Sequence, residues 1–485
     1  MAIVGGGIAG LAAAFFLRDR AVAVTVLEGS PRLGGKLAIC EVAGIAVDEG
    51  AESLLARRPE GTDLIGAVGL AGQLVRPGTT SAAIWTRGQM RPLPRRQFMG
   101  VPADLDELTR SGILSPEGNA RSRADLELPV TARDGDVSVA GYVGARFGGE
   151  LVDRLVDPLL GGVYAGRSDQ LSFEATLPGL ARASRERRSL AEAAASLLPP
   201  PAAGQPGPAP GPVFTTLAGG LGTLPPALAA ASGAAVRTGA MVRGLARVPG
   251  GWRLTVGSAR APEWLDADAV ILALPARPAG RLLAALPVAA AASALGEIGY
   301  ASMAIVTLAY PAAAFGSLPE GSGYLVPAVD GRPVKAVTFS TVKWPHLLAG
   351  ARQAGRRPRP PGGDIHLVRC SVGRLGEEAV LQRDDRELAA LAGADLAAAT
   401  GVSGAPLDTR VTRWGGGLPQ YTVGHLDRVQ RIRAGVAGQP GLAVCGAALD
   451  GIGIPACIAS ARLAADQVLS HLKSVAGTEL GAGRD

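Results

Sequence analysis

The stretch Ala2-Ile3-Val4-Gly5-Gly6-Gly7-Ile8-Ala9-Gly10 decides the fold of this chain. Its apolar start predicts a short strand, the glycines follow at the G-x-G-x-x-G spacing, and the apolar residues 11–18 predict a helix. A second apolar strand over residues 22–27 ends at Glu28. Glycines let the backbone approach a pyrophosphate, a helix N-terminus attracts negative charge, and a carboxylate after the second strand accepts hydrogen bonds from a ribose. The stretch therefore predicts a dinucleotide-binding βαβ unit.

Two other interpretations of the same stretch have to be weighed. A chain with 68 glycines in 485 residues produces chance matches to a glycine motif, and residues 2–17 carry no charge, as in the apolar part of a signal peptide. However, the strand before the glycines, the helix after them and the carboxylate of Glu28 are the context that a nucleotide site needs. No basic residue precedes the stretch, and three consecutive glycines suit a turn. We therefore favour the nucleotide site.

The composition is that of a globular protein with about two or three domains. Of the 485 residues, 47% are hydrophobic and 19% are charged, and the net charge of +6 is small for this length. The arginines are scattered, so nucleic-acid binding is not indicated. No run of 18 apolar residues lacks glycine or charge, so we expect no membrane span. The four cysteines have no C-x-x-C pairing and the four histidines do not cluster, so we expect reduced thiols, no metal and a cytoplasmic location.

The order of the predicted elements divides the chain into a discontinuous Rossmann-like domain and two inserted portions. The fold class is therefore α/β combined with α+β. We expect the nucleotide-binding domain at residues 1–75, 213–275 and 405–475, a helical insert on the substrate side at 76–212, a mixed-sheet substrate-binding portion at 276–404, and a tail at 476–485.

Several helix boundaries are also predicted. Glu52 and Ser53 stand before an apolar run and predict a helix that continues to Leu70. A helix over residues 151–160 is expected to end at Gly161 and Gly162, and a terminal helix is expected over residues 452–469. Loops are predicted where proline and glycine concentrate, at residues 196–212 and 350–363.

Three further stretches carry a resemblance to a known family. Together with residues 5–36, they resemble the oxygen-dependent coproporphyrinogen III and protoporphyrinogen IX oxidases, in their Gram-positive actinobacterial form, within the FAD-binding amine-oxidase superfamily. The resemblance runs from Ala2 to about Leu469. The stretches are Asp-Pro-Leu-Leu-Gly-Gly-Val-Tyr-Ala-Gly at 157–166, Leu-Pro-Gln-Tyr-Thr-Val-Gly-His at 418–425, and Gly-Ala-Ala-Leu-Asp-Gly-Ile-Gly-Ile-Pro-Ala-Cys-Ile at 446–458.

The resemblance implies non-covalent FAD and a six-electron oxidation of a porphyrinogen by dioxygen, giving a porphyrin and three molecules of hydrogen peroxide in haem biosynthesis. It favours coproporphyrinogen III as the substrate, with protoporphyrinogen IX as the near alternative. Two more distant alternatives are an oxidase of amines or carotenoids and a non-catalytic binder of the same fold. Hand-over of the porphyrin to the iron-insertion enzyme and peripheral contact with a membrane stay open.

The resemblance also assigns site residues to this sequence. Arg32 and Lys36 flank the second glycine turn, where cations suit phosphate oxygens. Phe98 lies in a stretch that departs from the family pattern, so the contacts to the substrate carboxylates, with Arg95 or Arg96 as candidates, stay open. The cofactor-binding residues are Gly5, Gly6, Gly7, Ile8, Ala9 and Gly10 at the pyrophosphate, Glu28 and Gly29 at the ribose, Val242 at the adenine, and Gly50, Ala51, Glu52, Ser53, Trp414, Ile452, Gly453 and Ile454 at the flavin. The substrate candidates are Phe98, Gly323, Leu325 and Trp344.

Three side chains invite a catalytic role, Tyr164, Tyr421 and His425. No carboxylate accompanies His425 in the sequence, so we favour a structural role for all three. Electron-rich pyrroles release hydride without a strong base, and the flavin carries the chemistry. We therefore expect no catalytic acid or base.

Overall fold

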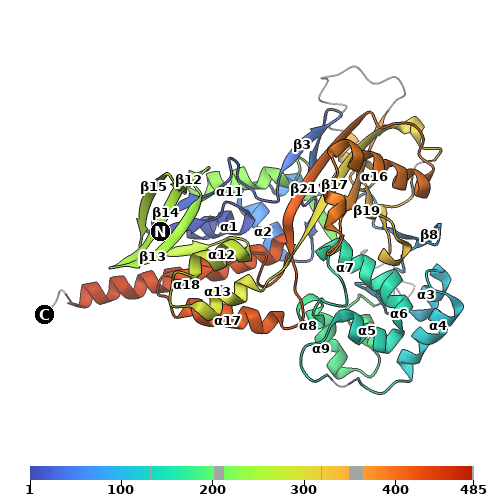
Figure 1. Cartoon of the computed structure of the whole chain (residues 1–485), viewed down its shortest axis with the longest axis horizontal. Coiled ribbons are helices and arrows are strands. Elements are labelled where there is room, and N and C mark those ends of the chain that lie inside the picture. Colours follow the sequence, from blue (N-terminus) through green and yellow to red (C-terminus); the bar gives the residue numbers. More distant parts are fainter. Residues whose placement is uncertain (132, 201–211, 318, 349–363, 483–485) are drawn as a thin grey trace.

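A five-stranded parallel sheet brings together segments that are remote in the sequence (Figure 1). The N-terminal strand lies at its centre. The strand order is β12 (Ala235–Arg237), β2 (Thr25–Leu27), β1 (Ala2–Val4), β16 (Val270–Leu272) and β22 (Leu442–Val444). The computed structural model describes residues 1–131, 133–200, 212–317, 319–348 and 364–482.

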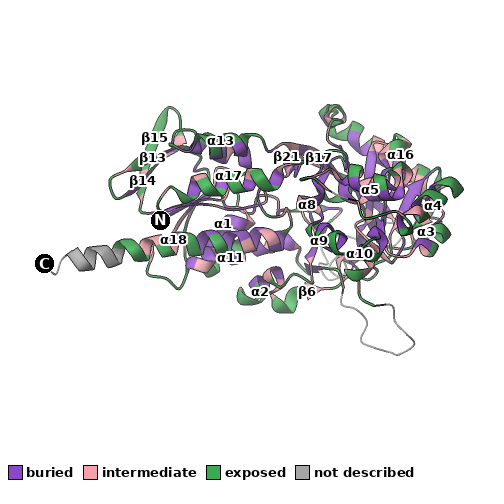
Figure 2. Ribbon diagram, turned by 90° about the horizontal axis from the view of Figure 1, so that it is seen from below, coloured by how far each residue is buried: buried purple, intermediate pink, exposed green. Residues whose placement is uncertain are grey.

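Alternate residues of the central strand face two different layers. Ile3 packs in one hydrophobic core, and Ala2 and Val4 pack in another on the opposite face, because successive side chains of a strand point to opposite faces. Helix α1 is almost entirely buried in the first core (Figure 2). The first layer holds α1 (Ile8–Leu17), α2 (Pro59–Ala67), α11 (Leu224–Ser232) and α18 (Ile454–Ala482), and the second holds β13 (Val242–Val248), β14 (Gly251–Ser258), β15 (Ala261–Ala267), α12 (Ala276–Leu283), α13 (Ala289–Gly296) and α17 (His425–Ala437).

A seven-stranded mixed sheet forms the second half of the molecule (Figure 1). Its pairings are antiparallel except the one between β18 and β7. Helix α16 (Asp385–Thr400), which starts in a capping box of Asp384 and Glu387, covers one face. The strand order is β21 (Asp408–Pro419), β17 (Tyr300–Pro311), β20 (Ile365–Val372), β19 (Val334–Phe339), β18 (Gly323–Leu325), β7 (Ala83–Thr86) and β8 (Gln89–Pro92).

A helical part packs beneath this sheet around its own apolar core (Figure 1). A π-helical turn at Val152–Val156 precedes α7 (Asp157–Tyr164). The short ladder of β9 (Gln97–Phe98) and β10 (Val101–Pro102) lies beside it. The other helices are α3 (Leu105–Ser111), α4 (Pro116–Arg123), α5 (Val139–Phe147), α6 (Gly149–Leu151), α8 (Phe173–Thr176), α9 (Pro178–Glu186) and α10 (Leu190–Ser196).

Two smaller elements complete the framework, a hairpin packed on the seven-stranded sheet and a three-stranded ladder beside the core around α1. The hairpin after the second glycine turn consists of β3 (Ile39–Val42) and β4 (Ile45–Asp48). Strand β11 (Phe214–Leu217) pairs on both sides, with β5 (Leu54–Leu55) and β6 (Leu74–Val75). Both elements tie residues before 80 to the middle of the chain.

Two predicted helix boundaries are wrong. No helix starts at Glu52, because Leu54 and Leu55 pair with β11; helix α2 begins at Pro59, whose fixed φ suits the first helical position. Helix α7 does not end at Gly161 and Gly162 but continues to Tyr164. Ala165, the residue after the helix, adopts a left-handed φ of 49° and caps it.

The C-terminal part also differs from the prediction. Helix α18 begins at Ile454 and continues to Ala482, so residues 476–482 are helical rather than a tail. Residues 408–419, which were assigned to the nucleotide-binding domain, form β21 at the edge of the seven-stranded sheet. Residues 201–211 and 349–363, which make up most of the two predicted loops, lie outside the described residues. The domain boundaries themselves stay a prediction.

Two general expectations can be compared with the structure. Cys40, Cys370, Cys445 and Cys457 are free. Within the described ranges, no helix combines the length and the apolar character that crossing a membrane requires.

One buried ion pair organises the helical part. Arg146 on α5 is 1% exposed and Asp125 is fully buried, and their atoms Nε and Oδ1 lie 2.5 Å apart. Asp125 also accepts hydrogen bonds from Ser189 Oγ (2.7 Å) and from the backbone N–H of Ala191 (2.9 Å), which lies in α10. The carboxylate therefore joins α5 to the start of α10.

We predict that Asp125→Ala lowers the free energy of unfolding by about 3–5 kcal/mol, because it leaves the Arg146 charge buried without its partner. Chemical denaturation of the full chain measures this. The control is Asp266→Ala, which breaks the exposed pair with Arg253 and should change little. Equal effects of the two substitutions would contradict the structural role of Asp125.

Candidate cofactor and substrate site

The first glycine turn has two kinds of glycine. A Cβ on Gly5, which has a φ of 110°, would lie 2.4 Å from Ala273 O, and one on Gly10 would lie 1.9 Å from Gly5 O. These two glycines are needed by the packing of the chain against itself. A Cβ on Gly7 would meet no atom within 4 Å. The space in front of Gly7 is therefore open, as a phosphate cradle requires.

Glu28 is held beside this turn. Its Oε2 accepts a hydrogen bond from Gly6 N and its Oε1 accepts one from Ser30 N, each at 2.7 Å. An ionised carboxylate offers about four lone-pair positions, so these two bonds leave room for hydroxyl donors of a ribose. The backbone thus fixes the orientation of the carboxylate that the sequence analysis assigned to the ribose.

The segment predicted to contact the adenine lies next to Glu28. Backbone N–H groups of Gly239 and Ala240 donate to Ser30 O and Glu28 O, each at 2.8 Å. A Cβ on Gly29 would lie 2.8 Å from Met241 Cε. Val242 follows as the half-buried first residue of β13. Residues more than 200 positions apart therefore meet at this edge of the sheet.

The second glycine turn faces the first. A Cβ on Gly35 would lie 3.5 Å from Gly7 Cα, so the two turns are close. Arg32 donates to Gly35 O (2.8 Å) and is exposed, so it closes its own turn. Burial lowers the pKa of Lys36, and the nearby Cys457 partly opposes this. Among the described residues no carboxylate forms an ion pair with Lys36, which leaves its charge available to an anionic group.

Glu52, in the segment predicted to approach the flavin, is clamped by two cations. Lys343 Nζ and Arg369 Nη1 each lie 2.6 Å from its carboxylate oxygens, and Arg369 Nη2 donates to Gly50 O at 2.8 Å. Burial alone raises the pKa of Glu52, but the two cations outweigh it and lower this pKa to about 2. Residues 50–52 are therefore fixed to β20 and to α14 (Ser340–Lys343).

Trp414 completes the attachment of this segment. Its Nε1 donates to Glu49 O at 2.9 Å, and a Cβ on Gly50 would lie 3.0 Å from the indole ring. The backbone N–H of Ala51 donates to Lys36 O at 3.2 Å, and Ser53 follows directly before β5. The structure thus brings together Lys36, the residues from Gly50 onwards and Trp414.

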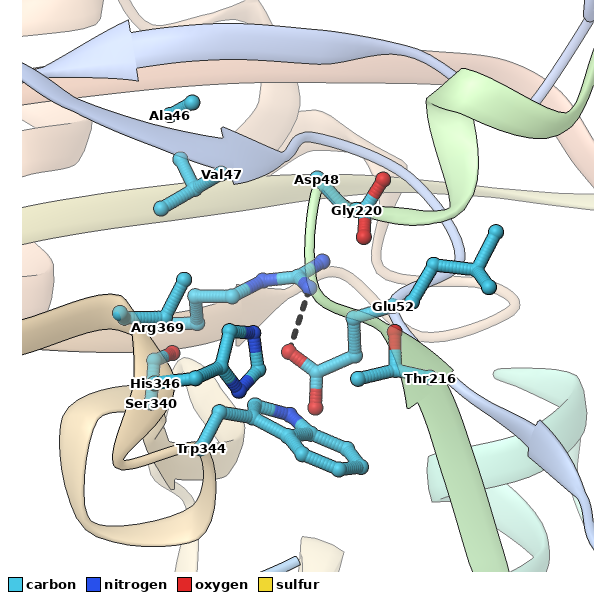
Figure 3. Close-up of a pocket in the computed structure, with 12 residues that line it drawn as sticks. Ala46, Val47, Asp48, Glu52, Thr216, Gly220, Ser340, Trp344, His346 and Arg369 are labelled. Carbon is cyan, nitrogen blue, oxygen red and sulfur yellow. Dashed lines mark hydrogen bonds and ion pairs between the residues drawn. The ribbon is translucent and has the colours of Figure 1, made fainter. Parts of the chain in front are cut away.

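A small cavity lies beside Glu52 and Arg369 (Figure 3). Its volume of about 30 Å³ suits one or two water molecules and is far too small for a macrocycle. Three polar atoms of its lining residues are buried without a hydrogen-bond partner in the part of the chain that the structure describes: Thr216 Oγ1, Ser340 Oγ and Trp344 Nε1. The substrate candidate Trp344 therefore lines a water-sized cavity.

The other substrate candidates lie elsewhere: Gly323 and Leu325 are on β18 of the seven-stranded sheet, and Phe98 is on β9 of the two-stranded ladder. Leu325 and Phe98 pack against the core of the helical part, and so does the predicted flavin residue Ile452. A Cβ on Gly162 of α7 would lie 3.4 Å from Leu325 Cδ2. A Cβ on Gly323 would lie 2.0 Å from Val337 O, so strand pairing requires this glycine.

Cross-strand register places Leu325 in a row with other side chains. Leu325 pairs with Ala336, Ala336 pairs with Ser371, and Ser371 pairs with Ile305. Paired residues share one face of a sheet. Residues two positions along a strand also share that face, so Arg369 belongs to it, two residues before Ser371. One face of the seven-stranded sheet therefore carries both Arg369, which binds Glu52, and the row of residues that includes Leu325.

The loop before α18 reaches this region. Ile452 is half-buried against the helical core, whereas Ile454, the first residue of α18, is buried in the core around α1. Gly453 O accepts from Cys457 N at 3.0 Å in the first turn of α18. Residues 452–454 thus lie between the two halves of the molecule.

The sequence analysis missed three residues that shape the site. Lys343 and Arg369 hold Glu52, and Asp48 accepts from Leu221 N (2.9 Å) and Gly222 N (3.0 Å) in the 3-10 turn before α11. Burial raises the pKa of Asp48 to about 6, despite these two bonds. Arg369 had a signal in the sequence, because a cation inside an otherwise apolar strand is rarely buried without a partner.

Comparison with known proteins identifies the family. Residues 8–469 match the family described as flavin containing amine oxidoreductase. The coproporphyrinogen III oxidase of Mycobacterium tuberculosis (strain ATCC 25618 / H37Rv) is 36% identical over 475 residues, covering 97% of each chain. That of Bacillus subtilis (strain 168) is 31% identical over 488 residues, covering 97% of this chain and 98% of the relative.

A solved structure agrees with these relatives. A protein of Exiguobacterium sp. 255-15, assigned provisionally as a protoporphyrinogen oxidase, superposes with a TM-score of 0.82 at 32% identity, covering 96% of this chain and 98% of that one. The resemblance noted in the sequence is thereby confirmed. The chain is an oxidoreductase of the flavin containing amine oxidoreductase family, in the branch of the coproporphyrinogen III oxidases.

Proposed function

We propose that this chain oxidises coproporphyrinogen III to coproporphyrin III with FAD and dioxygen, a step of haem biosynthesis. The observation that carries the proposal is one face of the seven-stranded sheet. Arg369, which pairs with Glu52 of the segment proposed to bind the flavin, and Leu325, a substrate candidate, both lie on this face. The names of the two full-length relatives support the substrate. A single sheet face would then hold cofactor and substrate in contact.

The described residues fit FAD. The open space before Gly7 suits the pyrophosphate, Glu28 the ribose, and Val242 the adenine. Lys36 adds a cation at the second glycine turn. When bound, the flavin accepts hydride from the carbon that bridges two pyrroles. We propose that FAD is held by the two glycine turns, by residues 50–53, by Trp414 and by residues 452–454.

The chain's own groups bind, orient and exclude water, and none is proposed as an acid or base. The hydroxyl of Tyr421 and the imidazole of His425 are both bonded to backbone groups, which supports a structural role for them. Leu325 and Ala336, both half-buried, offer apolar surface for a macrocycle. Arg96 donates to Pro199 O (3.1 Å). Arg95 is exposed, and we assign no carboxylate contact to either arginine.

Further elements of the proposal concern the cell. A cytoplasmic location agrees with the four free cysteines. Release of a free porphyrin requires a following enzyme that inserts iron, so we propose hand-over to such an enzyme. Protoporphyrinogen IX remains the second candidate substrate, because of the provisional name of the Exiguobacterium structure.

We predict that kcat/KM for coproporphyrinogen III exceeds that for protoporphyrinogen IX by at least about tenfold, which corresponds to about 1.4 kcal/mol. Four carboxylates rather than two give the former more charge-assisted contacts. Porphyrin fluorescence under air measures both rates. Equal or reversed preference would make protoporphyrinogen IX the substrate, and no turnover of either would refute the proposed function.

We predict that Gly7→Asp abolishes FAD binding without unfolding the chain, because its side chain would enter the open space with a negative charge. Gly7→Asn separates charge from size and should bind FAD more tightly than Gly7→Asp. Gly66→Asp, at another open position on α2, should retain the yellow colour. The visible spectrum of each purified protein decides, and a yellow Gly7→Asp protein would refute the pyrophosphate position.

We predict that Glu52→Gln lowers the free energy of unfolding by about 3 kcal/mol at pH 7, the equivalent of a pKa lowered from 4.5 to about 2. Because this pKa is lowered on folding, the stabilisation is present above pH 4.5 and is lost as the pH falls toward 2. Stability against pH should therefore be flatter in Glu52→Gln below pH 4.5. Glu263→Gln, from the exposed pair with Arg237, should keep the wild-type profile. Parallel curves for Glu52→Gln and wild type would contradict the clamp.

A further inference from the structure

We propose that Tyr421 and His425 are positioning residues that hold the loop 446–453 in the shape needed to bind FAD. This inference rests on the proposed function, because it takes Ile452 and Gly453 as flavin contacts. Neither residue touches the cofactor in the proposal. Both would act through the backbone of the loop, which links β22 to α18.

The loop needs an external support. Gly446 and Gly451 have φ angles of 120° and 145°, which L-residues with side chains rarely adopt, and residues 446–453 form no helix or strand. Among the described residues, one backbone hydrogen bond joins two residues of the loop, from Leu449 N to Gly446 O at 3.3 Å. The other bonds reach outside it: Gly446 N donates to Ser460 Oγ of α18 at 3.0 Å, Gly453 O accepts from Cys457 N, and Asp450 pairs with Arg433. Its shape therefore depends on neighbouring segments.

Tyr421 closes the loop with one hydroxyl group. The hydroxyl donates to Ala447 O at 2.7 Å and accepts from Gly451 N at 2.8 Å. The side chain is 1% exposed, so water does not replace these bonds easily. One atom thus ties two points of the loop that are four residues apart, directly before Ile452.

His425 holds the middle of the same loop. Its Nε2 lies 2.9 Å from Leu449 O, and because a carbonyl only accepts, Nε2 carries the hydrogen. The His425 ring is fully buried and stacks on the Tyr421 ring, with 3.8 Å between the ring centroids and an angle of 13° between the ring planes. Each of the two rings therefore fixes the other as well as the loop.

The support is itself anchored to the helical part. Ser172 N donates to Tyr421 O, and Gly424 N donates to Asp136 Oδ2, each at 2.8 Å. Gln420 Nε2 donates to Tyr164 O at the end of α7, also at 2.8 Å. Helix α8, which Ser172 caps, lies beside α17 (Figure 1). The stretch 420–425 is therefore a rigid bracket between the helical part and the loop.

The test is a titration of FAD into the apo form of the full chain, followed by fluorescence quenching and the visible absorption spectrum. Tyr421→Phe removes the hydroxyl and keeps the ring, and His425→Leu removes the donor to Leu449. We expect each to weaken FAD binding about tenfold and to shift the visible flavin spectrum. His425→Gln, which keeps a side-chain N–H donor, should restore affinity to within about threefold of wild type.

The matched control is Tyr300→Phe. The Tyr300 hydroxyl accepts from Ala276 N at 2.7 Å, so this variant also loses a partly buried hydrogen bond to the backbone, at α12 and not at the backbone of the loop. We expect its FAD affinity and spectrum to stay unchanged. If Tyr300→Phe weakens FAD as much as Tyr421→Phe does, or if His425→Gln binds as poorly as His425→Leu, the effects are general loss of stability and the inference is wrong.

The outcomes separate this inference from the proposed function. Unchanged FAD affinity in both Tyr421→Phe and His425→Leu overturns the inference, even in an enzyme that oxidises coproporphyrinogen III. The expected affinity changes in a protein that oxidises no porphyrinogen support the inference and refute only the function. If Tyr421→Phe does not fold, the pair His425→Leu and His425→Gln decides by the same comparison.

Discussion

The site depends on one cluster of buried charge, Glu52 between Lys343 and Arg369. Glu52 belongs to the segment that follows the β3–β4 hairpin. Arg369 lies on β20 of the seven-stranded sheet, and Lys343 lies at the end of α14, the short helix that follows β19. A buried carboxylate with a pKa of about 2 is strongly attracted to its partners, and removal of either side leaves an unpaired charge in a poorly hydrated place. The cluster therefore fixes the position of the cofactor-binding half relative to the sheet that forms the other wall.

The seven-stranded sheet makes sense as a two-sided element. One face is a conventional apolar core under α16. The other carries Arg369 and Trp414 toward the hairpin, and Leu325 and Ala336 toward the helical part, because residues on paired strands share a face. The same bracket of residues, 420–425, reaches from the end of this sheet to the helical part and to the loop before α18. The residues proposed to bind cofactor and substrate thus lie on elements that support each other.

Local signals made much of this structure predictable. The βαβ unit and the carboxylate of Glu28 follow from the short-range pattern of residues 2–28. The failures have long-range causes. Strand β5 exists because residues 54–55 pair with a strand about 160 residues away, which overrides a helical pattern. The partners of Glu52 are nearly 300 and more than 300 residues distant, so no local motif shows that Lys343 and Arg369 belong to the site. The motif at 418–425 was visible, but its contacts with the loop were not.

The most direct test of the account is anaerobic mixing of the purified yellow protein with coproporphyrinogen III while the visible flavin absorbance is followed. If residues 50–53 hold the flavin next to a substrate bound at Leu325 and Ala336, the yellow absorbance must be lost on mixing. It must return when air is admitted, with formation of coproporphyrin. A flavin that keeps its absorbance in the presence of excess substrate would mean that the two sites are not in contact, and would contradict the proposed arrangement.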